Sequence, residues 1–163
     1  MKSRRSKVSI ESIMVMLLMI AFSIAVSLMI TQGSQIFKQS IDNKEEDENL
    51  RIAMSYINMR IKQNDYADKI NLESNVIEGL SAIVIEHIDE EEGFRSYIYY
   101  DDNYLYECYT DEIPTKEIST QIIDSNGIRF EERIDKNQLV IYYSQRRGQD
   151  MIELEQIITL RSN

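Results

Sequence analysis

The chain has 163 residues, with 18 lysines and arginines against 28 aspartates and glutamates, so its formal net charge at pH 7 is −10. An acidic chain of this kind is a poor ligand for nucleic acid and for anionic lipid surfaces, and we expect no direct nucleic-acid partner. The single cysteine, Cys108, excludes an internal disulfide, and the single histidine leaves little material for a histidine metal site or a catalytic triad.

The first element along the chain is an uncharged apolar run, residues 13–31, which follows a basic N-terminus and Glu11. At ~1.5 Å per residue, a helix of this length measures roughly 28 Å, about the thickness of the hydrocarbon core of a bilayer. The run therefore predicts a single transmembrane helix. Four basic residues precede it, so the positive-inside rule predicts that residues 1–12 are cytoplasmic and that the remainder is extracytoplasmic.

A cleaved secretory signal is the alternative interpretation of this segment. Such signals have a shorter apolar core, of roughly 7–15 residues, followed by a small-x-small cleavage site. The run here is longer, and the sequence that follows it, residues 31–35, matches such a site poorly. We therefore favour a retained membrane anchor.

We predict that residues 32–64 form a helical stem outside the membrane. Residues 42–49 contain no apolar side chain and form either a linker or an exposed stretch of continuous helix. No Gly or Pro interrupts them, which favours the helix. Beyond them, an apolar stripe with helical spacing predicts an amphipathic helix that packs on a sheet. The stripe consists of Leu50, Ala53, Met54, Ile57 and Ile61.

After residue 80 the apolar period changes from 3.6 to 2, which predicts a globular head of antiparallel strands within residues 65–163. The expected strands are 80–87, 94–100, 104–109, a segment in which Ile128, Phe130 and Ile134 point inward, 139–143, and a last strand from 152 to 160. A hairpin turn is expected at 101–103 and a loop at 145–150. The predicted fold class is α+β: a transmembrane helix, extended by an amphipathic helix that packs on a mostly antiparallel sheet.

Tyrosines are concentrated in the predicted hairpin. Strand alternation divides them between the two faces of the sheet, so some would be exposed or covered by a partner. Exposed tyrosines provide large contact areas at low entropic cost, which makes Tyr97, Tyr99, Tyr104 and Tyr106 candidate interface residues. The ordinary preference of tyrosine for strands explains the same pattern, and the sequence leaves both interpretations open.

Carboxylates gather near the same hairpin, at Glu86, at 89–92 and at the Asp101–Asp102 pair. Calcium prefers several oxygen ligands of this type, but the spacing matches no EF-hand loop. A solvated run of charge is the simpler interpretation. We expect no cofactor, and calcium binding by these clusters stays open.

The sequence Ser-Ile-Glu-Ser-Ile-Met-Val at residues 9–15 resembles the N-terminal signature of type IV pilin-like proteins, including the pseudopilins. The resemblance implies that a prepilin peptidase cleaves between Ser6 and Lys7, which makes Glu11 the fifth residue of the mature chain. It also implies that Glu11 pairs with the free amine of a neighbouring subunit during assembly. Ser6 stands where the family usually has Gly, and Lys7 stands where it usually has Phe or Met.

Residues 49–63, together with the strands that follow, resemble the region of minor pseudopilins in which a long helix passes into a globular head. The resemblance is closest to minor-pilin-like proteins of Gram-positive bacteria. It implies a structural subunit of a pilus, competence or secretion-like filament, whose partners are the membrane, other pilin-like subunits and a prepilin peptidase. The chain would act by assembly and not as an enzyme. Two alternatives stay open: a permanently anchored extracytoplasmic sensor or accessory domain, and a surface-tethered enzyme that uses the acidic clusters.

Overall fold

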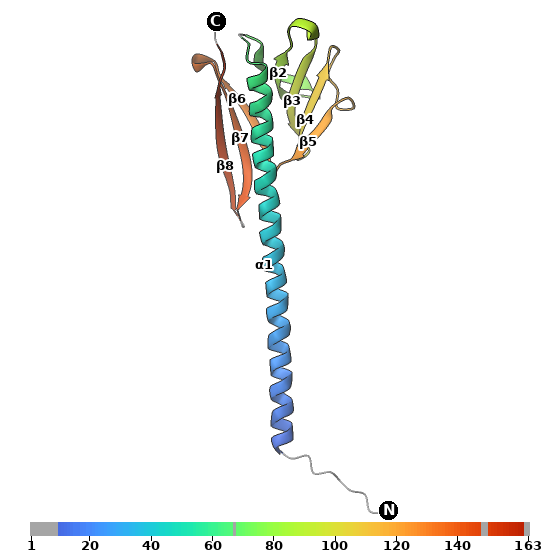
Figure 1. Ribbon diagram of the computed structural model, residues 1–163, viewed down its shortest axis with the longest axis vertical. Helices are drawn as coiled ribbons and strands as arrows, with labels where there is room; N and C mark the ends of the chain where they lie inside the picture. Colours follow the sequence, from blue (N-terminus) through green and yellow to red (C-terminus); the bar gives the residue numbers. More distant parts are fainter. Residues whose placement is uncertain (1–9, 67, 148–149, 162–163) are drawn as a thin grey trace, which may run out of the picture. The chain divides into compact units, whose positions relative to one another are not determined.

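The computed structural model of the protein describes residues 10–66, 68–147 and 150–161. The chain divides into two compact units, the first ending at Asp42 and the second beginning at Asn43, and each is described by itself. A long helix, α1 (Ile10–Gln63), contributes residues to both units, and antiparallel sheets follow it in the second (Figure 1). The predicted α+β class is therefore confirmed. The helical assignment also runs through residues 42–49, as expected from the absence of Gly and Pro there.

The second unit contains two antiparallel sheets in which each strand pairs with the next along the chain. The first has the order β1 (Ile70–Ile77), β2 (Leu80–Glu86), β3 (Arg95–Asp101), β4 (Tyr104–Thr110) and β5 (Thr120–Asp124). The second has the order β6 (Ile128–Arg133), β7 (Gln138–Arg147) and β8 (Asp150–Thr159). Two short 3-10 helices, η1 (Asp89–Glu91) and η2 (Ile134–Lys136), lie between strands.

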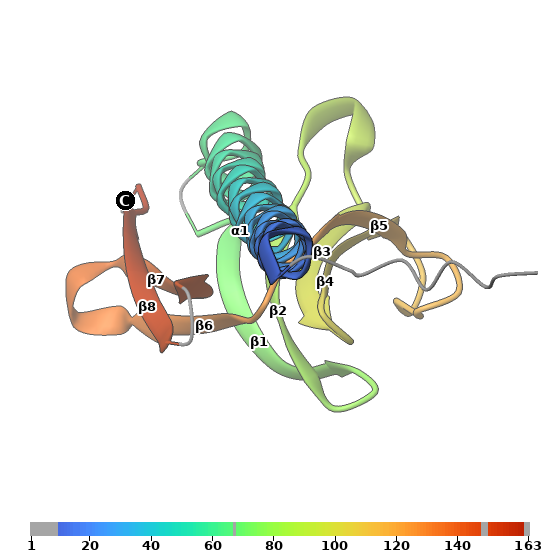
Figure 2. The same cartoon turned by 90° about the horizontal axis from the view of Figure 1, so that it is seen from below.

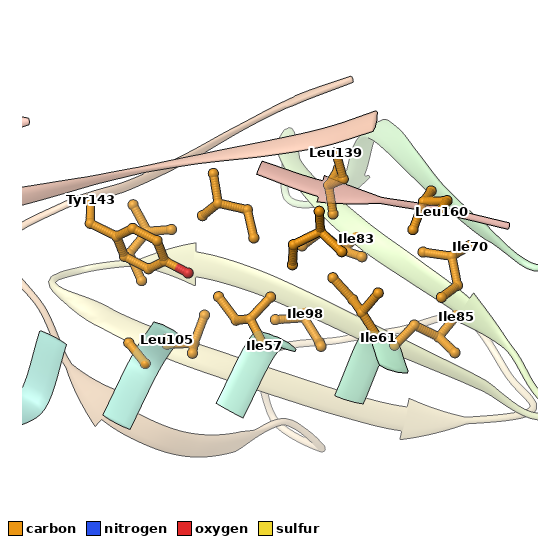
Figure 3. Close-up of a cluster of buried hydrophobic side chains, with 14 of the residues drawn as sticks. Ile57, Ile61, Ile70, Ile83, Ile85, Ile98, Leu105, Leu139, Tyr143 and Leu160 are labelled. Carbon is orange, nitrogen blue, oxygen red and sulfur yellow. The ribbon is translucent and has the colours of Figure 1, made fainter. Parts of the chain in front are cut away.

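The main core forms where the second unit's part of α1 meets both sheets. Leu50, Ala53, Ile57 and Ile61 of the predicted stripe are buried, and Met54 packs against them. The side chains opposite them come from β1 to β4 and from β6 to β8. The two groups of strands lie on different sides of this part of α1 (Figures 1 and 2). Figure 3 shows part of this core and labels Ile57 and Ile61 of the helix together with Leu139, Tyr143 and Leu160. The amphipathic stripe thus stabilises the junction of the two sheets.

The central strands of the five-stranded sheet are buried on both faces. Ile83 and Ile85 belong to the core beside α1, whereas Ala82 and Val84, which alternate with them, belong to a second cluster on the opposite face. This second cluster also contains Tyr97, Tyr99, Cys108 and Ile77. Cys108 lies on β4 and is fully buried.

Local sequence explains two of the boundaries in this unit. Asp102 and Asn103 join β3 to β4 and both have positive φ, 50° and 67°, as a tight two-residue hairpin requires. At the end of α1, the side-chain amide of Asn64 donates to the carbonyl of Arg60 at 2.9 Å, and the basic residues of the last turn complement the helix dipole.

Three expectations for the strands are wrong. Ile134 does not alternate inward, because the chain turns into η2 there and the side chain is 80% exposed. Residues 145–150 are not a loop throughout, since β7 continues to Arg147 and β8 begins at Asp150. The prediction also omitted β1 and β5, the two outer strands of the five-stranded sheet.

Candidate functional site

The most unusual surface of the chain is the apolar part of α1 in the first unit. All described side chains from Ile10 to Ile41 are exposed. Within residues 13–30, fourteen large apolar side chains are at least 38% exposed. At about 1.5–3 kcal/mol for each side chain fully removed from water, covering this surface is worth on the order of 20 kcal/mol. A surface of this kind needs an apolar environment.

Among the described residues, α1 is the one helix that is long and apolar enough to cross a membrane, with a mean hydropathy of 2.8 over its best 18-residue window. This property is shared by membrane anchors and by signal sequences. The segment is therefore of one of these two types by length and composition.

The polar side chains within the apolar segment are satisfied by the helix itself. The hydroxyls of Ser23, Ser27 and Thr31 donate to carbonyls four residues earlier, at 2.8, 2.9 and 2.9 Å. In hydrocarbon an unsatisfied hydroxyl would cost several kcal/mol, roughly 4–8 on a cyclohexane scale. These internal hydrogen bonds make the three residues compatible with lipid or with neighbouring apolar helices.

Glu11 lies in the first turn of α1 as the structure describes it, and its side chain is exposed. A carboxylate in the first turn of a helix interacts favourably with the helix dipole. Ser6 and Lys7, the predicted processing site, lie outside the described residues. The predicted partner of Glu11 is the amine of a neighbouring subunit, so the intersubunit role of Glu11 stays a prediction.

The four candidate interface tyrosines are not equivalent. Tyr97 and Tyr99 are 5% and 0% exposed in the second cluster, so they offer almost no surface to a partner, and burial raises the pKa of Tyr99 above its ordinary value. Tyr106 stacks on Tyr99 with ring centroids 5.3 Å apart, and Tyr104 contacts Tyr106 edge-on at 6.3 Å. The expectation of an interface therefore reduces to Tyr104 and Tyr106, which are partly exposed.

The segment between β4 and β5 helps to cover these tyrosines. The ammonium of Lys116 lies 5.8 Å from the centre of the Tyr106 ring and pairs with Asp101. The hydrogen bond and the charge of Asp101 raise the pKa of Lys116. Sequence alternation alone does not reveal this cover, because it comes from outside the sheet.

Part of the acidic residues singled out from sequence pairs with basic side chains. Glu86 pairs with Lys69 at 3.1 Å and with Arg95 at 3.0 Å, and Asp101 pairs with Lys116. Among the described residues, these clusters contain no group of three or more His, Cys, Asp or Glu side chains placed to hold a metal ion.

His87 follows β2 directly, as expected for a strand-end residue. Its Nε2 lies 2.9 Å from Ser96 Oγ, and its Nδ1 lies 3.2 Å from Glu91. These three groups have the order of a nucleophilic triad. Ser96 is 0% exposed, however, so in this arrangement its hydroxyl is closed to a substrate.

A polar cluster that the sequence did not predict joins α1 to β4. Glu107 accepts hydrogen bonds from the phenol of Tyr56 and from the guanidinium of Arg60, whose Nε lies at 2.7 Å. Burial, followed by the bond to Glu107, raises the pKa of Tyr56 above its ordinary value. Tyr56 and Arg60 are four residues apart on one helix face, but Glu107 lies 47 to 51 residues further on, so local spacing could not pair them.

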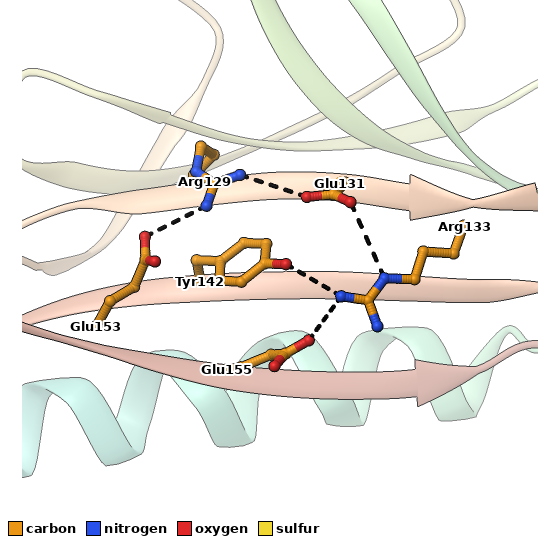
Figure 4. A network of polar contacts seen from close by, with 6 residues as sticks. All are labelled: Arg129, Glu131, Arg133, Tyr142, Glu153 and Glu155. Atoms are coloured by element: carbon orange, nitrogen blue, oxygen red, sulfur yellow. Dashed lines mark hydrogen bonds and ion pairs between the residues drawn. The ribbon is translucent and has the colours of Figure 1, made fainter.

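A charged network covers the outer face of the three-stranded sheet (Figure 4). Arg129 reaches Glu153 at 3.3 Å and stacks over Tyr142 at 3.9 Å, while Arg133 reaches Glu155 at 2.9 Å. These side chains are mostly 34–57% exposed, so each pair contributes little, about 0–1 kcal/mol.

Comparison with known proteins gives one match, which covers most of the second unit. Residues 48–146 match the model of a family described as a domain of unknown function (DUF4860). Neither the curated proteins nor the solved structures contain a match to the chain. The matched region includes the last part of α1, the five-stranded sheet, and β6 with nearly all of β7, and it ends before β8. The chain belongs to the DUF4860 family.

Proposed function

We propose that the protein is a minor pilin-like or pseudopilin-like subunit of a type IV pilus, competence or type II secretion-like filament, and that it acts by assembly. The observation that carries the proposal is the exposed apolar surface of residues 13–30, whose hydroxyls at Ser23 and Ser27 are satisfied internally, as is that of Thr31. Such a helix is stable in a bilayer before assembly and among neighbouring helices afterwards, since both environments cover its apolar side chains.

Glu11 supplies specificity in this proposal. A carboxylate at the edge of an apolar helix is costly to desolvate unless a cation pairs with it. The free amine of a neighbouring subunit, exposed by cleavage between Ser6 and Lys7, provides that cation and fixes the axial register of the two helices.

The second unit serves as the extracytoplasmic head. Within this unit, the α1 residues pack against side chains of both sheets. Tyr104 and Tyr106 are its candidate contacts with neighbouring subunits. The acidic character of the chain favours protein partners over nucleic acid.

The test compares full-length Glu11→Ala with Glu45→Ala, which removes an exposed carboxylate of the same helix. Each variant is co-expressed with a prepilin peptidase and the partner subunits of its host. Sheared surface filaments and membranes are then collected and assayed for the chain. We expect Glu11→Ala to accumulate in membranes and to be depleted from filaments by roughly tenfold or more, since an unpaired buried charge costs several kcal/mol.

Glu45→Ala should enter filaments like the wild type. Equal incorporation of Glu11→Ala and wild type would contradict the role of Glu11. Absence of the wild-type chain from filaments, together with an uncleaved N-terminus in membranes, would instead favour a permanently anchored sensor or accessory domain.

A further inference from the structure

The strand β8 (Asp150–Thr159) forms one edge of the three-stranded sheet. It pairs with β7 over its ten residues without a register shift, and among the residues that the structure describes no strand pairs with its other edge. The outer strands of the five-stranded sheet are less regular, because β5 has five residues and the register of β1 shifts between Glu73 and Ile77. A long, regular edge can serve as a template for an added strand.

The unpaired backbone groups of this edge can be assigned to particular residues. The N–H of Leu160 donates to the carbonyl of Asn137 at 2.9 Å, which continues the β7–β8 ladder by one pair. The direction of such hydrogen bonds alternates along an antiparallel strand. Alternate residues of β8 therefore direct their N–H and C=O groups away from β7, namely Met151, Glu153, Glu155, Ile157 and Thr159. Within the described part of the chain, no hydrogen bond uses these groups.

The outer face of this edge is acidic. Glu153 and Glu155 lie there, and their side chains are 53% and 41% exposed. Each meets an arginine of β6 through its Oε1 atom (Figure 4), Arg129 at 3.3 Å and Arg133 at 2.9 Å respectively. A carboxylate accepts several hydrogen bonds, and both glutamates stand on the last strand before the free edge. Basic side chains on an added strand would therefore find partners in this row.

The opposite face of the edge is apolar. Ile158 is buried there, and Leu154 packs against the main core. Ile152 and Leu154 are only partly buried. An added strand continues the alternation of side chains across the sheet, so apolar residues at its alternate positions would cover them.

The strand β8 is a poor partner for a second copy of itself. Its sequence, DMIELEQIIT, contains no Lys or Arg. Antiparallel pairing of two copies would gather the glutamates of both in one row, and like charges directly opposite each other destabilise a sheet. The acidic side chains thus act against self-association and leave the edge open to a basic strand.

We propose that the β8 edge binds an extended, basic peptide segment of a partner protein, which adds to the sheet as a strand antiparallel to β8. The backbone of this segment pairs with the outward N–H and C=O groups of β8. Its Lys or Arg side chains meet Glu153 and Glu155, and its alternate apolar side chains pack beside Ile152 and Leu154. The proposal is independent of the filament function, since it concerns only the second unit.

The test uses the full-length protein in detergent micelles and three fluorescent synthetic peptides. The first is Thr-Val-Thr-Val-Lys-Val-Lys-Val-Thr, which places its lysines opposite the two glutamates. The second carries Glu in place of both lysines. The third keeps the lysines but is N-methylated at their backbone amides, so that it retains the charge and loses two donors to the edge. Fluorescence anisotropy measures binding, and amide hydrogen exchange followed by NMR identifies the residues that are covered.

The matched protein variants separate the edge from the rest of the outer face. The double variant Glu153→Gln and Glu155→Gln removes the charge at the edge, whereas Glu131→Gln removes an exposed charge of the same face on β6. We expect the double variant to bind the lysine peptide roughly three- to tenfold more weakly, and Glu131→Gln to bind it like the wild type. The N-methylated and glutamate peptides should bind the wild type at least roughly tenfold more weakly. The lysine peptide should slow amide exchange at Glu153, Glu155 and Ile157.

The proposal is overturned if the lysine peptide binds no better than its N-methylated form, because any attraction would then come from charge alone. It is also overturned if the amides of Glu153, Glu155 and Ile157 exchange as fast with the lysine peptide as without it. Protection of the same amides without peptide, rising with protein concentration, would overturn it as well and assign the edge to a second copy of the chain.

Discussion

Replacement of Ile57 by alanine tests whether α1 stabilises the second unit from inside its core. Ile57 is 0% exposed and belongs to the cluster that includes side chains of both sheets. The change removes three carbons, worth about 0.8 kcal/mol each in transfer free energy, or about 2.4 kcal/mol. The cavity left behind adds roughly 1–2 kcal/mol, so we expect a loss of about 3.4–4.4 kcal/mol in the free energy of unfolding.

The loss can be measured as a change in unfolding temperature. The second unit runs from Asn43 to Asn163. At about 2.1 cal/mol/K per residue, a unit of about 120 residues has an unfolding entropy near 0.25 kcal/mol/K, so the expected fall is roughly 14–18 °C. The assay is thermal unfolding of the full-length protein in detergent micelles, followed by near-ultraviolet circular dichroism.

Ile52→Ala is the matched control for this experiment. Ile52 lies on the same helix but is 43% exposed, so its truncation should cost less than about 1 kcal/mol. The gain in helix propensity is the same for both variants and cancels in the comparison. If the two variants unfold within about 1 kcal/mol of each other, α1 does not form the core of the unit.

Three further predictions concern polar and backbone features of the second unit. Glu107→Gln should lower the free energy of unfolding, measured in urea, by about 2 kcal/mol, because it weakens a largely buried pair with two donors. Glu153→Gln, which affects an exposed pair, should lower it by less than about 0.5 kcal/mol. Equal losses in the two variants would contradict this. Burial raises the pKa of Tyr143. Above about pH 10, therefore, Tyr143 loses its proton in the unfolded state but keeps it in the folded state. The free energy of unfolding should fall as the pH rises beyond that point. Tyr143→Phe should reduce this alkaline loss, and an unchanged pH profile would argue against the burial. Gly127→Ala should lower the unfolding temperature, because a Cβ there would lie 2.9 Å from Ser144 Oγ. Gly33→Ala is the control: its Cβ would have no neighbouring atom within 4 Å, so it should not reduce the helical circular dichroism signal.

Elements with strong periodicity could be predicted from the sequence. The apolar stripe from Leu50 to Ile61 marked the buried face of α1, and Asp102-Asn103 marked the hairpin turn. In both cases the signal is local: a helical period of apolar residues and residues that tolerate positive φ.

The omitted strands lack such a signal. In β1 only Ile70 and Ile77 are buried, and the register shifts between Glu73 and Ile77, so alternation is lost. The five-residue β5 is short and pairs on one side only, with β4. Outer strands need fewer apolar residues because one edge remains unpaired, and their patterns are correspondingly weak.

Local sequence patterns could not predict the division into two sheets or the polar contacts, for a different reason. They depend on contacts between distant residues, such as Glu107 with Tyr56, and Gln145 with Asp47 98 residues earlier. Tyr97 and Tyr99 show the same limit, since their burial depends on elements outside their own hairpin. Alternation indicates which face a side chain occupies, but not whether that face is covered.

The N-terminus of the chain in sheared surface filaments tests the central proposal most directly. Intact mass and N-terminal sequencing of the native protein identify its first residue in filaments and in membranes. We predict a chain in the filament fraction that begins at Lys7 and retains residues 13–31. A chain confined to membranes with residues 1–6 intact, or a chain that has lost the whole apolar segment, would contradict assembly through this helix.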